Sequence, residues 1–346
     1  MDADKNQAQV KNNPAADAAD PKEGIMKPVT WAGASLMMVL AQLAGAQDYP
    51  NKPVRWVIPF ALGGGAEFVG NTVAKKLTEA LKQPVVVEHR PGGAGTAGAE
   101  LVAKASPDGY SLLQGQLAPI SIYPALHAKP AYDPLRDFAP ISRLVFVAQF
   151  LVVHPSLPVK SLKELVALAK SKPRGIHYSA ADYGSGPHLA MEWIKAATGI
   201  DMVYVPFEGG ATTVSALVTG NTSVAFAAAP GALPRMKSGK LRSIAVASAK
   251  RSSDLPDLPT VAESGIPGFE YVIWYGLLAP AKTPKEIIEK LNTEVVKTLK
   301  DPETVRELAS RGAEASPTTP EAFAKYLRED QERWKKVVKT AGIKLN

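Results

Sequence analysis

The chain has 346 residues and a formal net charge of +7, and 46% of its residues are hydrophobic and 21% charged, which excludes disordered, collagen-like and disulfide-stabilised classes. It contains no cysteine, so thiolate catalysis, thiolate zinc sites and iron–sulfur clusters are excluded as well. At about 100 to 200 residues per domain, this length predicts two domains.

The first 46 residues are predicted to lie outside the folded core. Residues 1–25 form a polar extension that is poor in aromatic residues. From Met26 onward, a lysine, an apolar stretch over 31–46 and the small residues Ala44 and Ala46 are typical of a secretory signal over 26–46, cleaved after Ala46. A membrane-spanning helix needs about 20 apolar residues, so an uncleaved anchor is the less favoured alternative.

The exported part alternates between extended and helical patterns. Apolar, β-branched segments predict strands at 54–58, 85–88, 110–113, 146–153, 202–205, 223–226, 241–246 and 271–278. Helical patterns lie between them at 67–81, 99–105, 162–171, 188–198, 212–219 and 232–238. Such alternation predicts an α/β fold with mostly parallel sheets flanked by helices.

After Pro280 the sequence predicts helices alone. Two of them, at 284–299 and 302–311, open with proline in the first turn. A capping sequence at 318–321 opens the last helix, which reaches about residue 340.

Two long extended segments divide this pattern. They cover 143–154 and 269–278, at the transitions between the first, middle and last thirds of the chain. A pair of crossings there predicts two lobes with a cleft between them. The first lobe would comprise 48–145 plus 275–346, and the second 146–274, joined by strands that bend.

The positive charge gives no sign of a nucleic-acid or membrane surface. Basic residues occur in ones and twos beside acidic residues, without interleaved aromatic side chains. The net charge remains compatible with an anionic ligand.

A glycine-rich loop at 59–67 joins the first strand to the first helix. Glycine there lets backbone N–H groups approach a ligand closely, and a helix N-terminus favours negative charge. The loop has no Gly-Lys-Ser/Thr and is therefore not a Walker loop. From this motif alone, a carboxylate or phosphate cradle and a simple tight turn are equally favoured.

A second loop at 93–98 matches G-x-G-x-x-G, the pattern of dinucleotide-binding turns. That interpretation also needs an acidic residue at the end of the next strand to bind the ribose. The strand at 110–116 ends in glutamines instead, so a dinucleotide cofactor is disfavoured.

A third loop at 179–189 contains Ser185 and His188. The pair suggests a hydrolase, but Gly184-Ser185-Gly186 is not a G-x-S-x-G elbow. The favoured interpretation is that Ser185 caps the following helix or offers its hydroxyl to a ligand, with a neutral His188 beside it. His177 and His188 show no metal-binding spacing, so no metal site is predicted.

Taken in order, motifs over about 49–343 resemble those of the substrate-binding proteins of tripartite tricarboxylate transporters. In the first third they are Tyr49-Pro50-x-Lys52-Pro53-Val54-Arg55, Pro59-Phe60-x-x-Gly63-Gly64-Gly65, Arg90-Pro91-Gly92-Gly93-Ala94-Gly95 and Ala105-x-Pro107-Asp108-Gly109-Tyr110. Further along they are Gly184-Ser185-x-x-His188-Leu189, Val205-Pro206-Phe207-x-Gly209, Gly239-Lys240-Leu241-Arg242, Leu258-Pro259-Thr260-Val261-Ala262-Glu263 and Trp274-Tyr275-Gly276-Leu277-Leu278-Ala279-Pro280.

The resemblance implies a periplasmic, two-lobed binding protein without catalytic activity or cofactor. Such a protein traps a small organic carboxylate in the cleft, mainly with backbone N–H groups and water, and delivers it to membrane partners. It is expected to act as a monomer. The residues carried over are Pro59, Phe60, Gly64, Gly65, Ala66 and Glu67 in the first loop, and Ala180, Gly184, Ser185, His188, Phe207 and Ala228 in the second lobe.

Three departures from the family's pattern bear on the ligand. Glu67 stands where the family usually has aspartate, Glu208 lies near a usual lysine or arginine, and small apolar residues occupy 227–229. These changes favour a monocarboxylate or an aromatic acid over a citrate-like ligand. Two alternatives remain open, which are an exported hydrolase using Ser185 and His188, and a sensor that presents its ligand to a signalling partner.

Overall fold

The computed structural model describes residues 49–60, 62, 65–127, 129–181, 183–207 and 209–343. The predicted extension at 1–25 and signal at 26–46 lie outside these residues, as do Gly64 and Glu208. From Asp48 on, the chain clusters as one compact unit. The boundaries of the two lobes within that unit stay a prediction.

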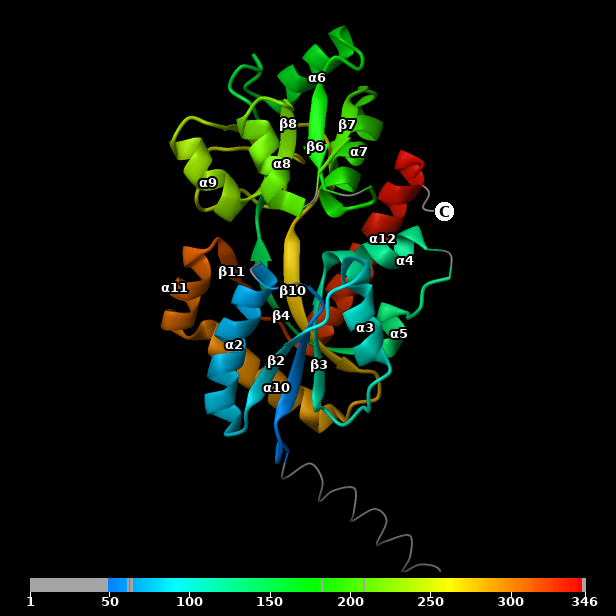
Figure 1. Ribbon diagram of the computed structural model, residues 1–346, viewed down its shortest axis with the longest axis vertical. Coiled ribbons are helices and arrows are strands. Elements are labelled where there is room, and N and C mark those ends of the chain that lie inside the picture. Colours follow the sequence, from blue (N-terminus) through cyan, green and yellow to red (C-terminus); the bar gives the residue numbers. More distant parts are fainter. Residues whose placement is uncertain are drawn as a thin grey trace, which may run out of the picture. The chain divides into compact units, whose positions relative to one another are not determined.

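Two sheets organise this unit (Figure 1). The first has the strand order β11-β4-β10-β3-β1-β2. Its strands are β1 (Val54–Ile58), β2 (Val85–His89), β3 (Ser111–Gln116), β4 (Phe138–Val147), β10 (Ile273–Pro280) and β11 (Ala313–Ala315). The second sheet has the order β7-β6-β8-β5-β9. Its strands are β5 (Gln149–Val153), β6 (His177–Ala180), β7 (Val203–Pro206), β8 (Val224–Ala228) and β9 (Arg242–Val246).

Both sheets are mixed, so the prediction of mostly parallel sheets was wrong in part. β1 pairs in parallel with β2 and β3, and β6 with β7 and β8. The strands that carry the chain between the sheets, β4, β5 and β10, pair antiparallel with their neighbours. Strand direction depends on long-range pairing, which the alternation of local patterns does not record.

Helices cover both faces of each sheet. Those beside the first sheet are α2 (Gly65–Leu81), α3 (Thr96–Ala103), α4 (Tyr123–Leu126), α5 (Pro134–Asp137), α10 (Lys285–Lys300) and α11 (Pro302–Ser310), with the short turns η1 (Gly93–Gly95) and η2 (Ala118–Ile122). Those beside the second sheet are α6 (Leu162–Ser171), α7 (Gly186–Thr198), α8 (Gly209–Val218) and α9 (Ala229–Lys237). The last helix, α12 (Pro320–Ala341), packs against β4 and η2 and also against α7 (Figure 1).

The chain leaves the first sheet through β4 and β5, which meet at Ala148. The predicted single strand at 146–153 is therefore two strands in different sheets. The chain returns through residues 247–272, where the N–H of Tyr271 donates to the carbonyl oxygen of Ala247 at 2.8 Å and the N–H of Ala247 donates to that of Gln149 at 2.8 Å. The exit and the return thus lie side by side.

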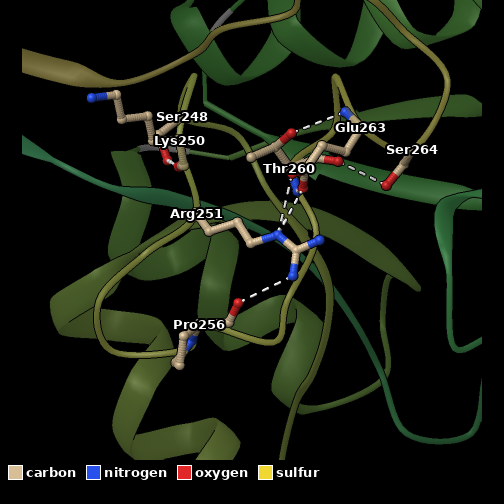
Figure 2. A network of polar contacts seen from close by, with 7 residues as sticks. All are labelled: Ser248, Lys250, Arg251, Pro256, Thr260, Glu263 and Ser264. Carbon is tan, nitrogen blue, oxygen red and sulfur yellow. Dashed lines mark hydrogen bonds and ion pairs between the residues drawn. The ribbon is translucent and has the colours of Figure 1, made fainter.

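The long connection between β9 and β10 is held by its own polar contacts (Figure 2). Glu263 Oε2 accepts the N–H of Thr260 at 2.8 Å, and Thr260 Oγ1 accepts the N–H of Glu263 at 2.9 Å, which is a capping box. Arg251 Nε donates to the same Glu263 carboxylate at 3.0 Å. These contacts order a segment that has no long helix or strand of its own.

A close contact between Gly276 of β10 and Phe323 of α12 generates a stability prediction. A methyl group built on Gly276 would lie 2.2 Å from Phe323 Cζ, and Phe323 is fully buried. We expect Gly276→Ala to lower the free energy of unfolding by about 1 to 3 kcal/mol through overpacking, measured by urea denaturation.

Gly231→Ala in α9 is the matched control, because its methyl group would meet only Arg235 Nη1, at 4.0 Å. It should leave stability unchanged or raise it slightly. The double variant Gly276→Ala, Phe323→Leu should lose less stability than the two single variants together. An unchanged midpoint for Gly276→Ala would contradict the packing described for β10 and α12.

Candidate functional site

The first predicted loop lies at the carboxyl end of β1. Pro59 packs so closely against Gly98 that a methyl group on this glycine would lie 2.7 Å from Pro59 Cβ. The carbonyl oxygen of Phe60 lies 2.9 Å from His89 Nδ1, which donates the proton of this bond. Both contacts fix the chain at Pro59 and Phe60, directly after β1.

The first turn of α2 contains three of the predicted residues, Gly65, Ala66 and Glu67. Ala66 is buried, and the Glu67 carboxylate lies 4.0 Å from His89 Nε2. The first N–H groups of a helix have no acceptor within it, and this end of the helix dipole favours an anion.

An uncapped helix N-terminus lies at α7, after β6. Ser185 is the N-cap residue, as the sequence predicted, but its side chain makes no capping hydrogen bond. Its Oγ is buried and has no hydrogen-bond partner among the described residues. Because Pro187 carries no N–H, the first-turn donors are the N–H groups of Gly186 and His188.

His188 is held in one neutral tautomer. The N–H of Gly184 donates to His188 Nδ1 at 3.2 Å, so the ring proton lies on Nε2. Burial lowers the pKa of His188, the Glu192 carboxylate raises it by a smaller amount, and the nearby Lys195 ammonium lowers it further. The side chain can therefore donate one hydrogen bond without carrying charge.

Tyr183 and Tyr204 contact His188, and sequence reasoning missed both. The ring centroids of Tyr183 and His188 are 4.6 Å apart, and those of His188 and Tyr204 are 4.4 Å apart. The Tyr204 hydroxyl donates to the carbonyl oxygen of Ala181 at 2.5 Å. These aromatic rings are a wall beside the N-terminus of α7. Tyr183 lies within the predicted loop at 179–189, whereas Tyr204 on β7 gave no sequence signal.

Ala180 and Phe207 lie at the ends of neighbouring strands. The N–H of Phe207 donates to the carbonyl oxygen of Ala180 at 3.0 Å, which continues the pairing of β6 and β7. Ala180 is buried and its carbonyl oxygen is used in this bond. Its position is thus explained by the sheet, while its predicted contact with a ligand stays a prediction.

The structure brings Gly65 and Ala228 together on one cavity of about 300 Å³. The walls come from α2, the ends of β4 and β8, the start of α9, β10 and the segment from α11 to β11. The side chains of Phe68, Ile273, Tyr275 and Arg311 also line this cavity. Ser185 and His188 do not line this cavity.

Among the described residues there is no Ser185–His188 hydrogen bond, no metal site and no membrane-spanning helix. Ser185 Oγ has no hydrogen bond there, so it makes none with His188, whose Nδ1 is occupied by Gly184. Within the same part of the chain, no group of His, Asp and Glu side chains is arranged to hold a metal ion. None of the helices described is long and apolar enough to cross a membrane.

This arrangement is that of the periplasmic binding proteins. Two mixed sheets each contain a strand that leads into a helix beginning at glycine, namely α2 at Gly65 and α7 at Gly186. The family model described as the tripartite tricarboxylate transporter family receptor matches residues 69–343. The chain belongs to this family, as the sequence motifs indicated.

Sequence and structure relatives agree with this assignment. Protein BugT of Bordetella pertussis is 32% identical over 307 residues, which cover 88% of this chain and 94% of that protein. The solved structure of the periplasmic binding protein BugD has a TM-score of 0.72 and 33% identity, covering 86% of this chain and 99% of that one. An R. palustris protein with adipate has a TM-score of 0.75 and 34% identity, covering 86% and 99%. MatC from Rhodopseudomonas palustris with bound malate has a TM-score of 0.72 and 31% identity, covering 84% and 100%.

The buried neutral state of His188 predicts a pH dependence of stability. Because its pKa is lowered in the folded protein, the unfolded chain binds more protons below the ordinary pKa of 6.5. Stability from this group is therefore complete above about pH 6.5 and decreases as the pH falls towards the folded pKa. We expect His188→Asn, whose Oδ1 still accepts the N–H of Gly184, to lose less stability than the wild type between pH 7.5 and 5.

Urea denaturation at several pH values measures this difference. His177→Asn at the exposed start of β6 is the control and should follow the wild-type curve. Parallel curves for the wild type and His188→Asn would show that the histidine gains a proton as readily in the folded state as in the unfolded one.

Proposed function

We propose that this protein is a periplasmic receptor that binds a small organic carboxylate between the two sheets and delivers it to the membrane components of a transporter. Membership of the receptor family supports the delivery step. The adipate and malate in the structures of relatives support a carboxylate as ligand. The predicted secretory signal at 26–46 supports the location, and the protein binds its ligand without converting it.

One observation carries the proposal, namely the Ser185 hydroxyl, which is buried without a partner at the uncapped N-terminus of α7. A buried hydroxyl without a hydrogen bond costs stability, typically about 1 to 3 kcal/mol. A carboxylate bound there would accept hydrogen bonds from this hydroxyl and from the N–H groups of Gly186 and His188, and the positive end of the helix dipole would stabilise its charge. This mode of binding needs no charged side chain of the protein.

The first turn of α2 is the second part of the proposed carboxylate site. The N–H groups of Gly65 and Ala66, at the start of this helix, have no acceptor within it. Gly64, Pro59 and Phe60 complete this loop in the proposed site, and Phe207 and Ala228 border it from the second sheet. A ligand that contacts both helix N-termini favours the arrangement in which the sheets approach each other.

A ligand screen with a matched pair of variants tests this function. We expect carboxylates to raise the unfolding temperature of residues 47–346 in a saturable way, with no product formed. Ser185→Ala should weaken binding of the best acid about tenfold, the equivalent of about 1.4 kcal/mol. Without ligand, the same variant should unfold at an unchanged or higher temperature, because it removes an unpaired buried hydroxyl.

Ser171→Ala on α6 is the control, since this exposed hydroxyl donates only to the carbonyl oxygen of Leu168. It should leave ligand affinity unchanged. Steady conversion of an acid by the purified protein, or full affinity in Ser185→Ala, would contradict the proposed role of the α7 loop.

A further inference from the structure

Tyr271 and Tyr275, which lie where the chain returns to the first sheet, have the same relation to the two helix starts of the proposed site. The Tyr271 hydroxyl lies 3.3 Å from the position that a Cβ on Gly186 would take, at the start of α7. The Tyr275 hydroxyl lies 3.3 Å from the corresponding position on Gly65, at the start of α2. One short segment of the chain thus places a hydroxyl at both helix N-termini.

Both tyrosines are buried, and their hydroxyls have no partner. Tyr271 is 2% exposed and Tyr275 is 8% exposed, and neither hydroxyl makes a hydrogen bond with any described residue. Buried side-chain polar groups are normally hydrogen-bonded to protein or to water. Ser185 Oγ lacks a partner in the same way. Two unpaired hydroxyls therefore lie at the start of α7 and one at the start of α2.

The Tyr271 ring is held in place by contacts with several elements. It packs edge to face against Phe226 of β8 and Trp334 of α12, with ring centroids 5.3 Å and 6.1 Å away. Its N–H donates to the carbonyl oxygen of Ala247 at 2.8 Å. A Cβ on Gly186 would lie 2.9 Å from the ring atom Cε2, so this close approach requires glycine. The hydroxyl is thus preorganised, and little conformational entropy is lost when it donates to a ligand.

The position of Tyr275 is set by the first sheet. Its backbone pairs with Gln116 of β3 and with Val145 of β4. Its side chain lines the cavity that Gly65 shares with Ala228. The hydroxyl therefore lies at this cavity, next to the first turn of α2.

Both groups remain hydrogen-bond donors at neutral pH. Burial raises the pKa of Tyr275 to about 12, and burial also raises the pKa of Tyr271 above its ordinary value. A hydroxyl that donates to a carboxylate forms a short, charge-assisted hydrogen bond. Two neutral donors beside two helix N-termini therefore suit an anion without adding a charged side chain.

We propose that the hydroxyls of Tyr271 and Tyr275 donate hydrogen bonds to the bound acid, one at the start of each ligand-binding helix. The inference rests on the proposed function, and it assigns two binding residues that lie outside the loops at 59–67 and 179–189. Because both tyrosines belong to one continuous segment, the acid is contacted by the part of the chain that joins the two sheets.

Phenylalanine variants test this inference, because they remove the hydroxyl and keep the ring. The probes are the sodium salts of adipate, malate and benzoate, titrated into the purified protein by isothermal titration calorimetry. We expect Tyr271→Phe and Tyr275→Phe each to weaken the tightest-binding acid about five- to tenfold. Without ligand, each variant should unfold at an unchanged or higher temperature, because an unpaired hydroxyl is removed. A role in packing alone would leave the affinity unchanged, since the ring is kept.

Tyr326→Phe is the matched control. Tyr326 of α12 also has a buried hydroxyl without a partner among the described residues, but its ring contacts Trp274 and the Arg143 guanidinium and neither helix start. This variant loses the same group from a comparable environment. It should bind each acid with wild-type affinity.

The outcomes separate this inference from the proposed function. Wild-type affinity in Tyr271→Phe or in Tyr275→Phe would overturn the paired assignment, while the receptor function stands. An equal loss of affinity in Tyr326→Phe would also overturn it, because the effect would then not depend on the helix starts. If the unaltered protein binds none of the three acids, the carboxylate function itself is contradicted, and this inference with it.

Discussion

The antiparallel pairing of β10 with β3 and β4 is the interaction on which the rest of the structure depends. It joins Tyr275 to Gln116 on one side and to Val145 on the other, so the last third of the chain lies at the centre of the first sheet. Without this pairing the chain would not return from the second sheet to the first. The position of the α2 loop relative to β8 would then not be fixed. Ile273 and Tyr275 of β10 line the cavity that Gly65 shares with Ala228, so this cavity depends on the position of β10.

One apolar cluster shared by both sheets accompanies this pairing. One cluster of buried residues runs from the first sheet through α12 to α6 and α7, while the opposite face of each sheet has a separate cluster. Trp334 of α12 contacts Tyr271, and Trp274 donates to the buried Asp330 carboxylate at 3.0 Å. The helix α12 thus packs on elements of both sheets, against β4 and η2 on one side and α7 on the other.

Local features of the site were predictable from the sequence, and long-range ones were not. Glycines at strand ends predicted where α2 and α7 begin, because backbone conformation and spacing are local properties, whereas the missing capping bond of Ser185 was not predicted. The predicted capping sequence before the last helix is likewise confirmed, with Thr319 Oγ1 accepting the N–H of Ala322 at 3.2 Å. The sequence placed Tyr275 in an apolar strand and Arg311 at the end of a surface helix. Only the pairing of β10 and β11 with β4 brings them to the cavity that Gly65 shares with Ala228. The irregular turns at 117–137 escaped prediction because their short helices have too few residues for a periodic pattern.

The chain enters and leaves residues 149–271 at adjacent points, which the backbone bonds of Gln149, Ala247 and Tyr271 hold together. This segment can therefore be exchanged as a module. Its two ends are joined to the rest by adjacent backbone segments, so a homologous module from a relative has to match this short seam and the surface of α12 that packs on α7. The proposed ligand contacts at Ser185 and His188 belong to the module, and those at Gly65 and Ala66 belong to the remaining scaffold. Selectivity in such receptors can therefore evolve by recombination of halves as well as by single substitutions.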